Sequence, residues 1–196
     1  MSSSSNLPID DLSGAPALMP RRAMLLALGA ALGTALGTML LAGLSQPALA
    51  SKDLLAGLQR WGSGEFRRFG LLVYEATLWA GDDPQRPPLA LRLDYKRNIP
   101  GKTIAEASVK EMRRFVSDES LLRLWGEQMQ RIFPDVQPGD HLLGVYHPDG
   151  VRFYQGDRLL GVIGLPGFAD AFFAIWLDAR SSAPELRQAL LRRPGG

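Results

Sequence analysis

Aromatic residues, β-branched residues and alternating apolar positions predict five β-strands in this chain. The pattern is clearest from 89 to 96, where Leu89, Leu91, Leu93 and Tyr95 fall on one face and mostly polar residues fall on the other. Another segment, rich in aromatic residues, predicts one long or bent strand, and three shorter apolar runs follow later. The expected strands are Phe66–Ala80, Leu89–Lys96, His141–His147, Val151–Gln155 and Arg158–Ile163.

Short connections rich in glycine, proline and aspartate separate the later strands. Pro148-Asp149-Gly150 and Gly156-Asp157 join the last three strands, and turns this short require antiparallel pairing. Before the first strand, the pattern predicts a short amphipathic piece from Lys52 to Trp61 and a Gly-Ser-Gly turn at 62–64. The strands are therefore expected to form an antiparallel sheet.

Apolar residues at helical spacing predict four helices. Thr103 with Glu106 has the spacing of a capping box at the start of the first helix, and Ser182 with Glu185 repeats that spacing at the start of the last. The expected helices span residues 103–115, 118–133, 168–178 and 182–191. Runs of strands separated by runs of helices indicate an α+β fold, in which helices cover one face of the antiparallel sheet.

The first fifty residues have the three parts of a secretory signal. Arg21 and Arg22 precede the apolar run 23–44, which carries no charge, and small residues at Ala48 and Ala50 form a cleavage site before Ser51. The chain is therefore expected to divide into a signal peptide, residues 1–50, and one domain, residues 51–196. This organisation predicts export to the periplasm.

Two export routes and one membrane anchor are consistent with this segment. The long polar start, the adjacent arginines and a glycine-diluted apolar run resemble a bacterial twin-arginine signal, and the general secretory route is the alternative. An uncleaved segment would be long enough to anchor the protein, since about 20 apolar residues span a bilayer. In that case the domain would face the periplasm, and this segment alone would contact the membrane.

The composition removes several classes of function. The 22 basic and 20 acidic residues nearly balance, so the sequence gives no reason to expect a nucleic-acid partner. No phosphate-binding glycine loop or nucleophile elbow is present, and a chain without cysteine and with two histidines lacks the known zinc spacings. His141 and His147 would lie about 20 Å apart on one strand, too far to share a metal ion. No metal site and no cofactor are predicted.

Basic and aromatic residues gather in the early strands. Tyr74 and Tyr95 have the apolar body and polar tip suited to a cleft between sheet and helices, and an arginine there could hold a carboxylate or a phenolate. The alternative is an ordinary solvated strand face. The candidate ligand-binding residues in these strands are Arg67, Arg68, Tyr74, Tyr95 and Arg97, and Arg67 and Tyr74 are also the candidate catalytic residues.

The sequence resembles the chalcone isomerase-like superfamily, in the version found in exported bacterial proteins. Three stretches carry the resemblance: GSGEFRRFGLLVYEATLW at 62–79, LALRLDYKRNIPGKTIAEASVKEM at 89–112, and the hairpins with the Phe-rich helix from 144 onward. The resemblance implies an open-faced antiparallel sheet with a ligand cleft beneath its helices. Plant members close a chalcone ring, others bind fatty acids, and some mitochondrial relatives bind haem.

The catalytic groups of the plant enzymes are not matched in this chain. The resemblance places the family's arginine at Phe66, its threonine at Tyr74, its tyrosine at Ile104 and its asparagine at Glu111. Arg67 lies one place beyond the arginine position, where a one-residue shift turns a strand side chain to the opposite face unless a bulge corrects it. Glu111 therefore joins the candidate ligand-binding residues, and the isomerase constellation is absent as such.

We therefore expect a periplasmic binder of an apolar, acidic small molecule such as a fatty acid, without turnover. If Arg67 faces the cleft, Arg67→Ala should weaken the binding of an acid, and Arg68 would face the other way. One alternative is an isomerase or intramolecular lyase in which Arg67 or Arg68 stabilises an oxyanion and Tyr74 is the acid or base. A second alternative is a haem-binding protein with His141 or His147 as the axial ligand.

Overall fold

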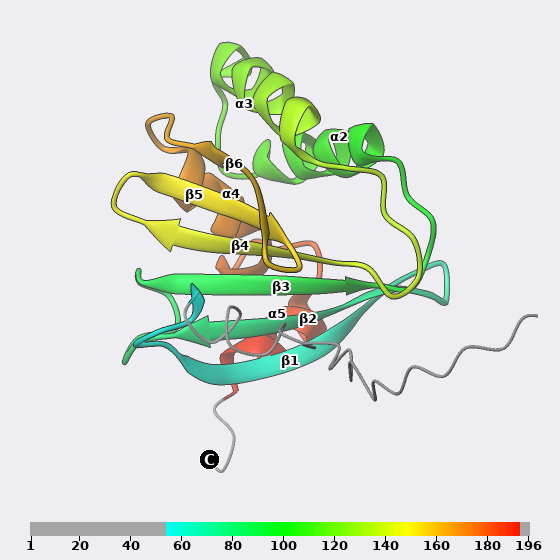
Figure 1. Ribbon diagram of the computed structural model, residues 1–196, viewed down its shortest axis with the longest axis vertical. Coiled ribbons are helices and arrows are strands. Elements are labelled where there is room, and N and C mark those ends of the chain that lie inside the picture. The colour runs from blue at the N-terminus through cyan, green and yellow to red at the C-terminus, as the bar shows by residue number, and fades with distance from the viewer. Residues whose placement is uncertain (1–53, 193–196) are drawn as a thin grey trace, which may run out of the picture. The chain divides into compact units, whose positions relative to one another are not determined.

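The computed structural model describes residues 54–192, and these residues build a six-stranded antiparallel sheet. The strands lie in sequence order, each paired with the next, so every connection returns the chain to the neighbouring position (Figure 1). Their bounds are β1 Gln59–Arg68, β2 Leu71–Ala80, β3 Leu89–Tyr95, β4 His141–His147, β5 Gly150–Gln155 and β6 Arg158–Ile163.

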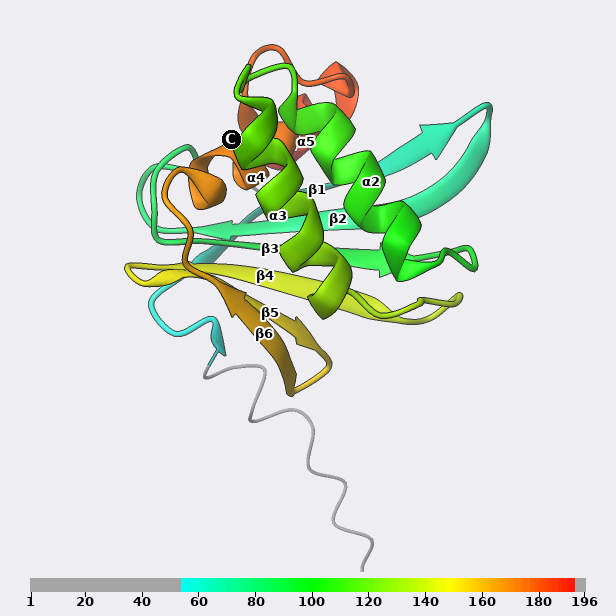
Figure 2. The same cartoon turned by 90° about the horizontal axis from the view of Figure 1, so that it is seen from above.

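Helices cover one face of this sheet (Figures 1 and 2). Two of them follow β3, and two follow β6, which confirms the α+β class and the antiparallel sheet with helices on one face. None of the helices in residues 54–192 is long and apolar enough to cross a bilayer. The helices are α2 Gly101–Met112, α3 Glu119–Ile132, α4 Phe168–Leu177 and α5 Pro184–Leu191.

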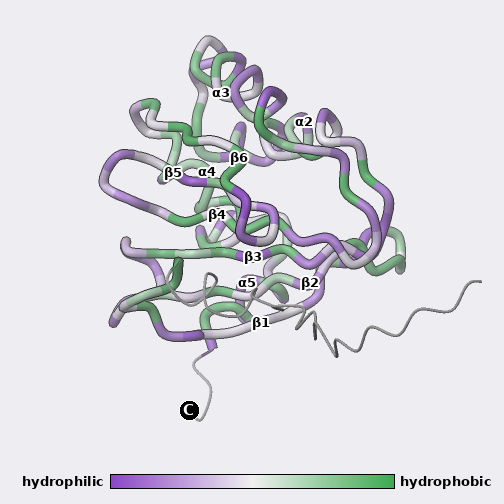
Figure 3. The backbone as a smooth tube through the Cα atoms, in the orientation of Figure 1, coloured by the Kyte–Doolittle hydropathy of each residue, from purple (hydrophilic) through white to green (hydrophobic). Residues whose placement is uncertain are grey.

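The alternation in β3 has the orientation that the sequence predicts. Leu89, Leu91, Leu93 and Tyr95 belong to the main core between sheet and helices. Helix α3 combines an apolar inner side with a polar outer side, and both colours follow each other along its coil in Figure 3. Burial of these apolar faces is the main force that holds the two layers together.

The opposite face of the sheet has a second, smaller cluster. Ala90, Leu143, Val145 and Tyr154 are buried there, and residues before β1 pack on them. The covering side chains are Leu54, Leu55 and Leu58, together with Trp79 of β2. The start of the described chain therefore shields part of the face that the helices leave open. The signal segment and cleavage site predicted for residues 1–50 lie outside the described residues.

The predicted long strand Phe66–Ala80 is wrong, because the chain reverses in its middle. Strands β1 and β2 form a hairpin whose two-residue turn is Phe69-Gly70, with Arg68 paired to Leu71. Both turn residues have positive φ, 52° and 78°. These values suit a type I′ turn, which matches the twist of the flanking strands. The sequence shows only one of the usual signals, because Phe69 occupies a position where asparagine is preferred.

The predicted Gly-Ser-Gly turn at 62–64 is also wrong. These residues lie inside β1 and pair with β2 opposite Leu78, Thr77 and Ala76. Their glycines provide space rather than a turn, since a Cβ at Gly62 would lie 2.2 Å from the Ala189 carbonyl oxygen of α5. The predicted amphipathic piece 52–61 likewise ends earlier, because β1 begins at Gln59.

The two predicted capping boxes do not form. Helix α2 begins at Gly101 with Pro100 as its N-cap, and the Asp135 carboxylate accepts the Gly101 N–H at 2.8 Å from a distant part of the chain. Helix α5 begins at Pro184 after Ala183, without a side-chain cap. The predicted start near Asp118 is confirmed, because its carboxylate accepts from the first N–H groups of α3.

Candidate ligand cavity

A cavity of about 300 Å³ lies between the sheet and the helices. Its floor comes from β1 to β5, and its walls and roof come from α2, α4 and the segments beside them. Most of its surface is apolar, and the volume is in the range of small-molecule sites. The apolar lining residues include Leu91, Leu93, Ile99, Ile104, Phe133, Leu142, Phe153, Phe172 and Ile175.

Most of the exposed residues of this lining are polar. Several of the lining residues are exposed to solvent, namely Arg68 of β1, Thr103 and Ala107 of α2, and Ser182 before α5. These exposed residues mark where the cavity meets the surface. The cavity therefore has a polar mouth and an apolar interior, as a site for an amphipathic molecule requires.

Tyr74 is fixed in the cavity wall by neighbours on three sides. Its ring stacks on Phe66 at a centroid distance of 4.9 Å and meets the Tyr95 ring edge-on at 6.0 Å. The indole Nε1 of Trp176 donates a hydrogen bond of 3.0 Å to the Tyr74 hydroxyl oxygen. Since this oxygen is an acceptor in that bond, the hydroxyl proton is available for a ligand.

Burial raises the pKa of Tyr74 well above its ordinary value, and the nearby Glu111 carboxylate raises it further, although the Trp176 hydrogen bond opposes the shift. Burial also raises the pKa of Tyr95, which is 2% exposed, and the neighbouring Tyr74 adds to that rise. Both phenols are therefore protonated at neutral pH. They can donate a hydrogen bond, but neither is suited to accept a proton as a general base.

The structure places Arg68, and not Arg67, on the cavity wall. Arg67 points to the other side of β1, where its guanidinium contacts the Glu65 carboxylate at 2.7 Å. Arg97 also lies outside the lining, because its Nε donates to the backbone carbonyl of Leu72. The expected orientation of the arginine pair is thus reversed. The alternation itself is as predicted, since neighbouring strand residues face opposite sides.

A β-bulge brings one extra side chain to this wall. Phe66 pairs with Tyr74 and Arg67 pairs with Leu72, so Val73 has no partner of its own on β1. The irregularity lets the consecutive residues Val73 and Tyr74 both line the cavity. No feature of the sequence indicated which residue would be inserted.

Glu111 lines the cavity from α2, and its charge is compensated. The Nε of Arg114 donates to the Glu111 carboxylate at 3.0 Å. Ser108, one turn earlier, also lines the cavity and uses its hydroxyl proton on the Ile104 carbonyl. The candidate residues that the structure brings together are therefore Arg68, Tyr74, Tyr95 and Glu111.

The histidines do not belong to this cavity. His141 and His147 are the first and last residues of β4. Leu142, the neighbour of His141, points into the core beneath the helices, so the odd-numbered residues of this strand, including both histidines, face the other side of the sheet. Within residues 54–192, no group of three metal-binding side chains is close enough to hold an ion. The cavity and an axial histidine therefore do not coincide in the described part of the chain.

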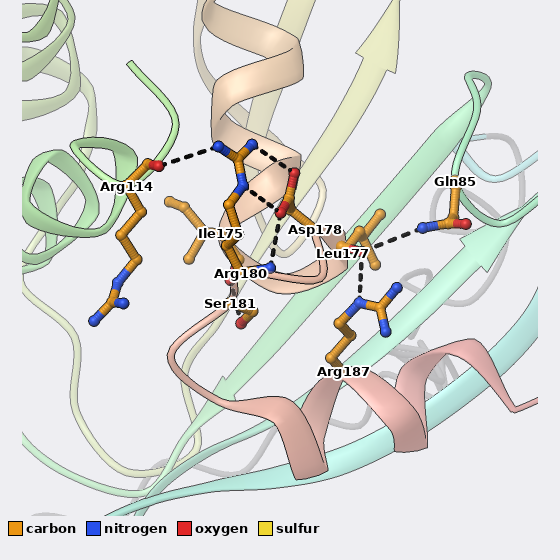
Figure 4. A network of polar contacts seen from close by, with 8 residues as sticks. All are labelled: Gln85, Arg114, Ile175, Leu177, Asp178, Arg180, Ser181 and Arg187. Atoms are coloured by element: carbon orange, nitrogen blue, oxygen red, sulfur yellow. Dashed lines mark hydrogen bonds and ion pairs between the residues drawn. The ribbon is translucent and has the colours of Figure 1, made fainter. Parts of the chain in front are cut away.

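A polar network ties the helices over the cavity to one another (Figure 4). The Arg180 guanidinium binds both oxygens of Asp178, at 2.9 and 3.0 Å, and its backbone N–H donates to the same carboxylate at 2.8 Å. Arg180 also donates to the Arg114 carbonyl just after α2 and lies over the Phe115 ring. The chain after α4 is thereby joined to the end of α2.

The same network continues into α5. Arg187 of α5 donates to the Leu177 carbonyl at the end of α4, and Gln85 donates to this carbonyl from the β2–β3 connection (Figure 4). The Ser181 hydroxyl donates to the Ile175 carbonyl at 2.7 Å. Since Ile175 also lines the cavity, these bonds hold the cavity roof in position.

The stability of the protein should depend on Asp178 at low pH. Its contacts with Arg180 lower the Asp178 pKa from the ordinary 3.8 to about 2. A lowered folded-state pKa contributes stability above pH 3.8, and that contribution is lost as pH falls towards 2. Asp178→Asn should therefore lower the melting temperature at pH 7, and the difference from the wild type should shrink between pH 4 and pH 2. Thermal unfolding followed by circular dichroism measures both effects.

Sequence reasoning missed Trp176 as a functional residue. In the sequence it is one of several apolar residues on a Phe-rich helix, and its spacing indicates core packing. Only the fold brings its indole N–H to a tyrosine 102 positions earlier. A buried indole that satisfies its donor on a cavity-lining hydroxyl is a positioning group for that hydroxyl.

The four positions that the resemblance matched to the catalytic residues of plant chalcone isomerases all line this cavity. Phe66, Tyr74, Ile104 and Glu111 surround one space, although they are far apart in the sequence. The cavity thus occupies the place in the fold that the resemblance implies, with different chemical groups around it.

Comparison with known proteins agrees with this assignment. A sequence model of the family described as chalcone isomerase-like matches residues 69–192. An uncharacterized protein of Haemophilus influenzae is 30% identical over 131 residues, which is 67% of this chain and 63% of that protein, so this chain spans less than two thirds of that relative. The crystal structure of a fatty-acid binding protein from Arabidopsis thaliana superposes with a TM-score of 0.54.

That superposition covers 69% of this chain and 87% of the plant protein at 12% sequence identity, so it concerns the fold alone. The family model covers the second strand onward, including Tyr74, α2 and the helices of the cavity roof. The chain therefore belongs to the chalcone isomerase-like family.

Proposed function

We propose that this protein binds one molecule of an apolar acid, with a fatty acid as the preferred class, and releases it unchanged. The observation that carries the proposal is the cavity, whose interior is lined almost entirely by hydrocarbon and aromatic side chains. Such a surface stabilises an alkyl chain through removal of its apolar area from water. The superposable plant structure belongs to a fatty-acid binding protein, which supports the same ligand class.

The polar end of the ligand would lie between Arg68 and Tyr74. Arg68 reaches the cavity from the exposed end of β1, and Tyr74 presents a hydroxyl whose oxygen is fixed by Trp176. A guanidinium and a phenol together offer donors of the kind that bind a carboxylate. In this arrangement the acid lies at the mouth and the alkyl chain lies beneath α2 and α4.

Turnover of a chalcone would need groups that the cavity lacks. Ring closure requires a stabilised phenolate and an acid or base of suitable pKa. Phe66 and Ile104 occupy two of the polar positions, Glu111 is paired with Arg114, and Tyr74 remains protonated because its pKa is raised. We therefore favour binding over the isomerase alternative, in which Tyr74 acts as the acid or base. Haem is not proposed, since neither histidine lines the cavity.

Binding of fatty acids can be measured by displacement of a fluorescent fatty acid from the purified protein. We expect saturated acids to compete, and the corresponding primary alcohols to compete less well because they lack the charge that Arg68 would hold. The alcohols have the same alkyl chains and are the matched control. Chalcone added to the same protein should close no faster than in buffer. Closure above that background, abolished in Tyr74→Phe, would replace the binding proposal by the isomerase alternative.

We further propose that the domain works in the periplasm after cleavage before Ser51. The support is the charged pair, the apolar run and the small residues of the first fifty positions. Replacement of both Arg21 and Arg22 by lysine should block export by the twin-arginine route, which requires the arginines. General secretion should continue, because the positive charge is kept. Fractionation of cells followed by N-terminal sequencing measures the outcome. A membrane-extracted protein that begins at Met1 would indicate the uncleaved anchor instead.

A further inference from the structure

The β1–β2 hairpin exposes two large apolar side chains at its tip, which comprises residues 67–71. Phe69 is 91% exposed and Leu71 is 56% exposed, and these are the most exposed large apolar residues in the described part of the chain. They lie two positions apart on either side of Gly70. Exposed apolar groups that are concentrated at one point of the surface are typical of an interaction site.

The backbone at the tip is unfavourable for the residue that occupies it. Phe69 has a φ of 52°, and it is the only residue other than glycine with positive φ in residues 54–192. A bulky side chain is disfavoured there by contact between its Cβ and the backbone, whereas asparagine or glycine adopts the conformation readily. Stability alone therefore does not account for an exposed phenylalanine at this position. Strain of this kind points to a function of the side chain.

Positive charge surrounds the two apolar residues. Arg68 lies over the Phe69 ring at 5.4 Å, and Arg97 lies beside the hairpin, bonded to the Leu72 carbonyl. Neither arginine is paired with a carboxylate of the described chain, whereas Arg67 and Lys96 are compensated by neighbouring glutamates. The tip thus carries a net positive charge, which complements an anionic surface.

The tip is next to the mouth of the cavity. Arg68 belongs both to the tip and to the cavity lining, and Val73 and Tyr74 continue the lining two residues beyond Leu71. In Figure 2 the hairpin runs out to the end of the sheet, away from β5 and β6. A surface bound by Phe69 and Leu71 would therefore lie beside the opening through which a ligand enters.

We propose that the hairpin tip docks on an anionic lipid bilayer, with Phe69 and Leu71 inserted among the lipids and Arg68 and Arg97 at the headgroups. An apolar side chain in the interface together with basic residues near anionic lipids is sufficient for reversible membrane binding. The bilayer then supplies or accepts the apolar molecule at the cavity mouth. This last step rests on the proposed function, whereas the docking itself does not.

Vesicle co-sedimentation with matched variants tests the docking. Vesicles of phosphatidylglycerol mixed with phosphatidylcholine should bind the protein more tightly than vesicles of phosphatidylcholine alone. Phe69→Asn should weaken binding to the mixed vesicles about tenfold or more. Leu159→Asn removes another exposed apolar residue, on β6 and away from the hairpin, and should leave binding unchanged. Arg97→Gln should reduce the preference for the anionic vesicles, because it removes one unpaired charge.

Phe69→Asn also provides its own folding control. Because asparagine suits the positive φ of this turn, the variant should melt at a temperature equal to or above that of the wild type, although it binds vesicles more weakly. Its affinity for fatty acid measured without vesicles should not change. A failure of fatty-acid binding in the wild type would therefore concern the proposed function, and a failure of vesicle binding would concern the hairpin.

The position of the contact can be measured directly. Brominated lipids quench the fluorescence of tryptophans that lie close to them. Vesicles that contain such lipids should quench the tryptophan fluorescence of a Phe69→Trp variant more than that of the wild type, whose own tryptophans give the background. This readout is independent of any contribution of the first fifty residues. Vesicle binding that is equal in the wild type and in Phe69→Asn would overturn the proposal. A second result would also overturn it: a wild-type protein that binds no vesicles but forms a dimer, where Phe69→Asn is monomeric. The tip would then contact a second copy of the chain.

Discussion

Replacement of Arg68 by alanine is expected to weaken fatty-acid binding tenfold or more. Arg68 lines the cavity at its exposed mouth, where its guanidinium can hold the ligand carboxylate. A charge-assisted hydrogen bond of this kind contributes about 1.5–3 kcal/mol, which corresponds to at least a tenfold change in affinity. Isothermal titration calorimetry or fluorescence displacement in the absence of vesicles measures the effect.

Arg67→Ala is the control for that experiment. Arg67 is the next residue in the same strand, has the same charge and is exposed, but it faces away from the cavity and is paired with Glu65. Its removal changes the net charge of the protein by the same amount and should leave the affinity within about twofold of the wild type, because exposed ion pairs contribute little. Equal losses in the two variants would mean that the arginines act through the general field of the hairpin rather than through a contact.

The orientation of this arginine pair shows what the sequence could not determine. Strand alternation predicts that Arg67 and Arg68 face opposite sides, and they do. Which of them faces the cavity depends on which face of β1 the helices cover, and Phe66 and Arg68 lie on that face. The bulge at Val73 belongs to β2, and it could not be located from the alternation of that strand alone.

Long-range contacts explain the other differences between prediction and structure. The N-cap of helix α2 is Pro100, three residues before the Thr103 of the capping-box motif, and Asp135 binds the Gly101 N–H from 34 positions further along the chain. The Trp176 bond to Tyr74 spans an even greater separation. By contrast, the apolar stripe of β3, the Asp118 cap of α3 and the three strands from 141 to 163 were predictable, because their signals are local.

The turn of the first hairpin lacks the usual sequence signal for a related reason. Phe69-Gly70 satisfies only half of the preference for a type I′ turn, whereas Gly-Ser-Gly at 62–64 looks like a loop. The chain nevertheless reverses at Phe69-Gly70. The glycines at 62 and 64 lie within β1, where the absence of a side chain allows α5 to pack closely against the strand. Glycine in a strand commonly has this role, and composition alone does not distinguish it from a turn.

Gly62→Ala is therefore expected to destabilise the domain strongly. A Cβ at this position would lie 2.2 Å from the Ala189 carbonyl oxygen and 2.5 Å from that of Leu190, and both are backbone atoms of α5 that no side-chain rotation can move away. The helix would have to shift, which would disturb the packing of Leu186 and Leu190 in the core. Overpacking of this kind costs about 3 kcal/mol in the free energy of unfolding.

Gly81→Ala is the matched control, since it adds the same methyl group just after β2. The nearest atom to its Cβ would be the Cδ of Pro88 at 3.8 Å, an ordinary contact. Chemical denaturation followed by tryptophan fluorescence should show a much lower midpoint for Gly62→Ala and a midpoint near that of the wild type for Gly81→Ala. Since Ser182 and Ala183 line the cavity immediately before α5, a shifted α5 should also weaken fatty-acid binding in any Gly62→Ala protein that remains folded. A Gly62→Ala protein as stable as the wild type would show that α5 does not pack against β1 as closely as the structure places it.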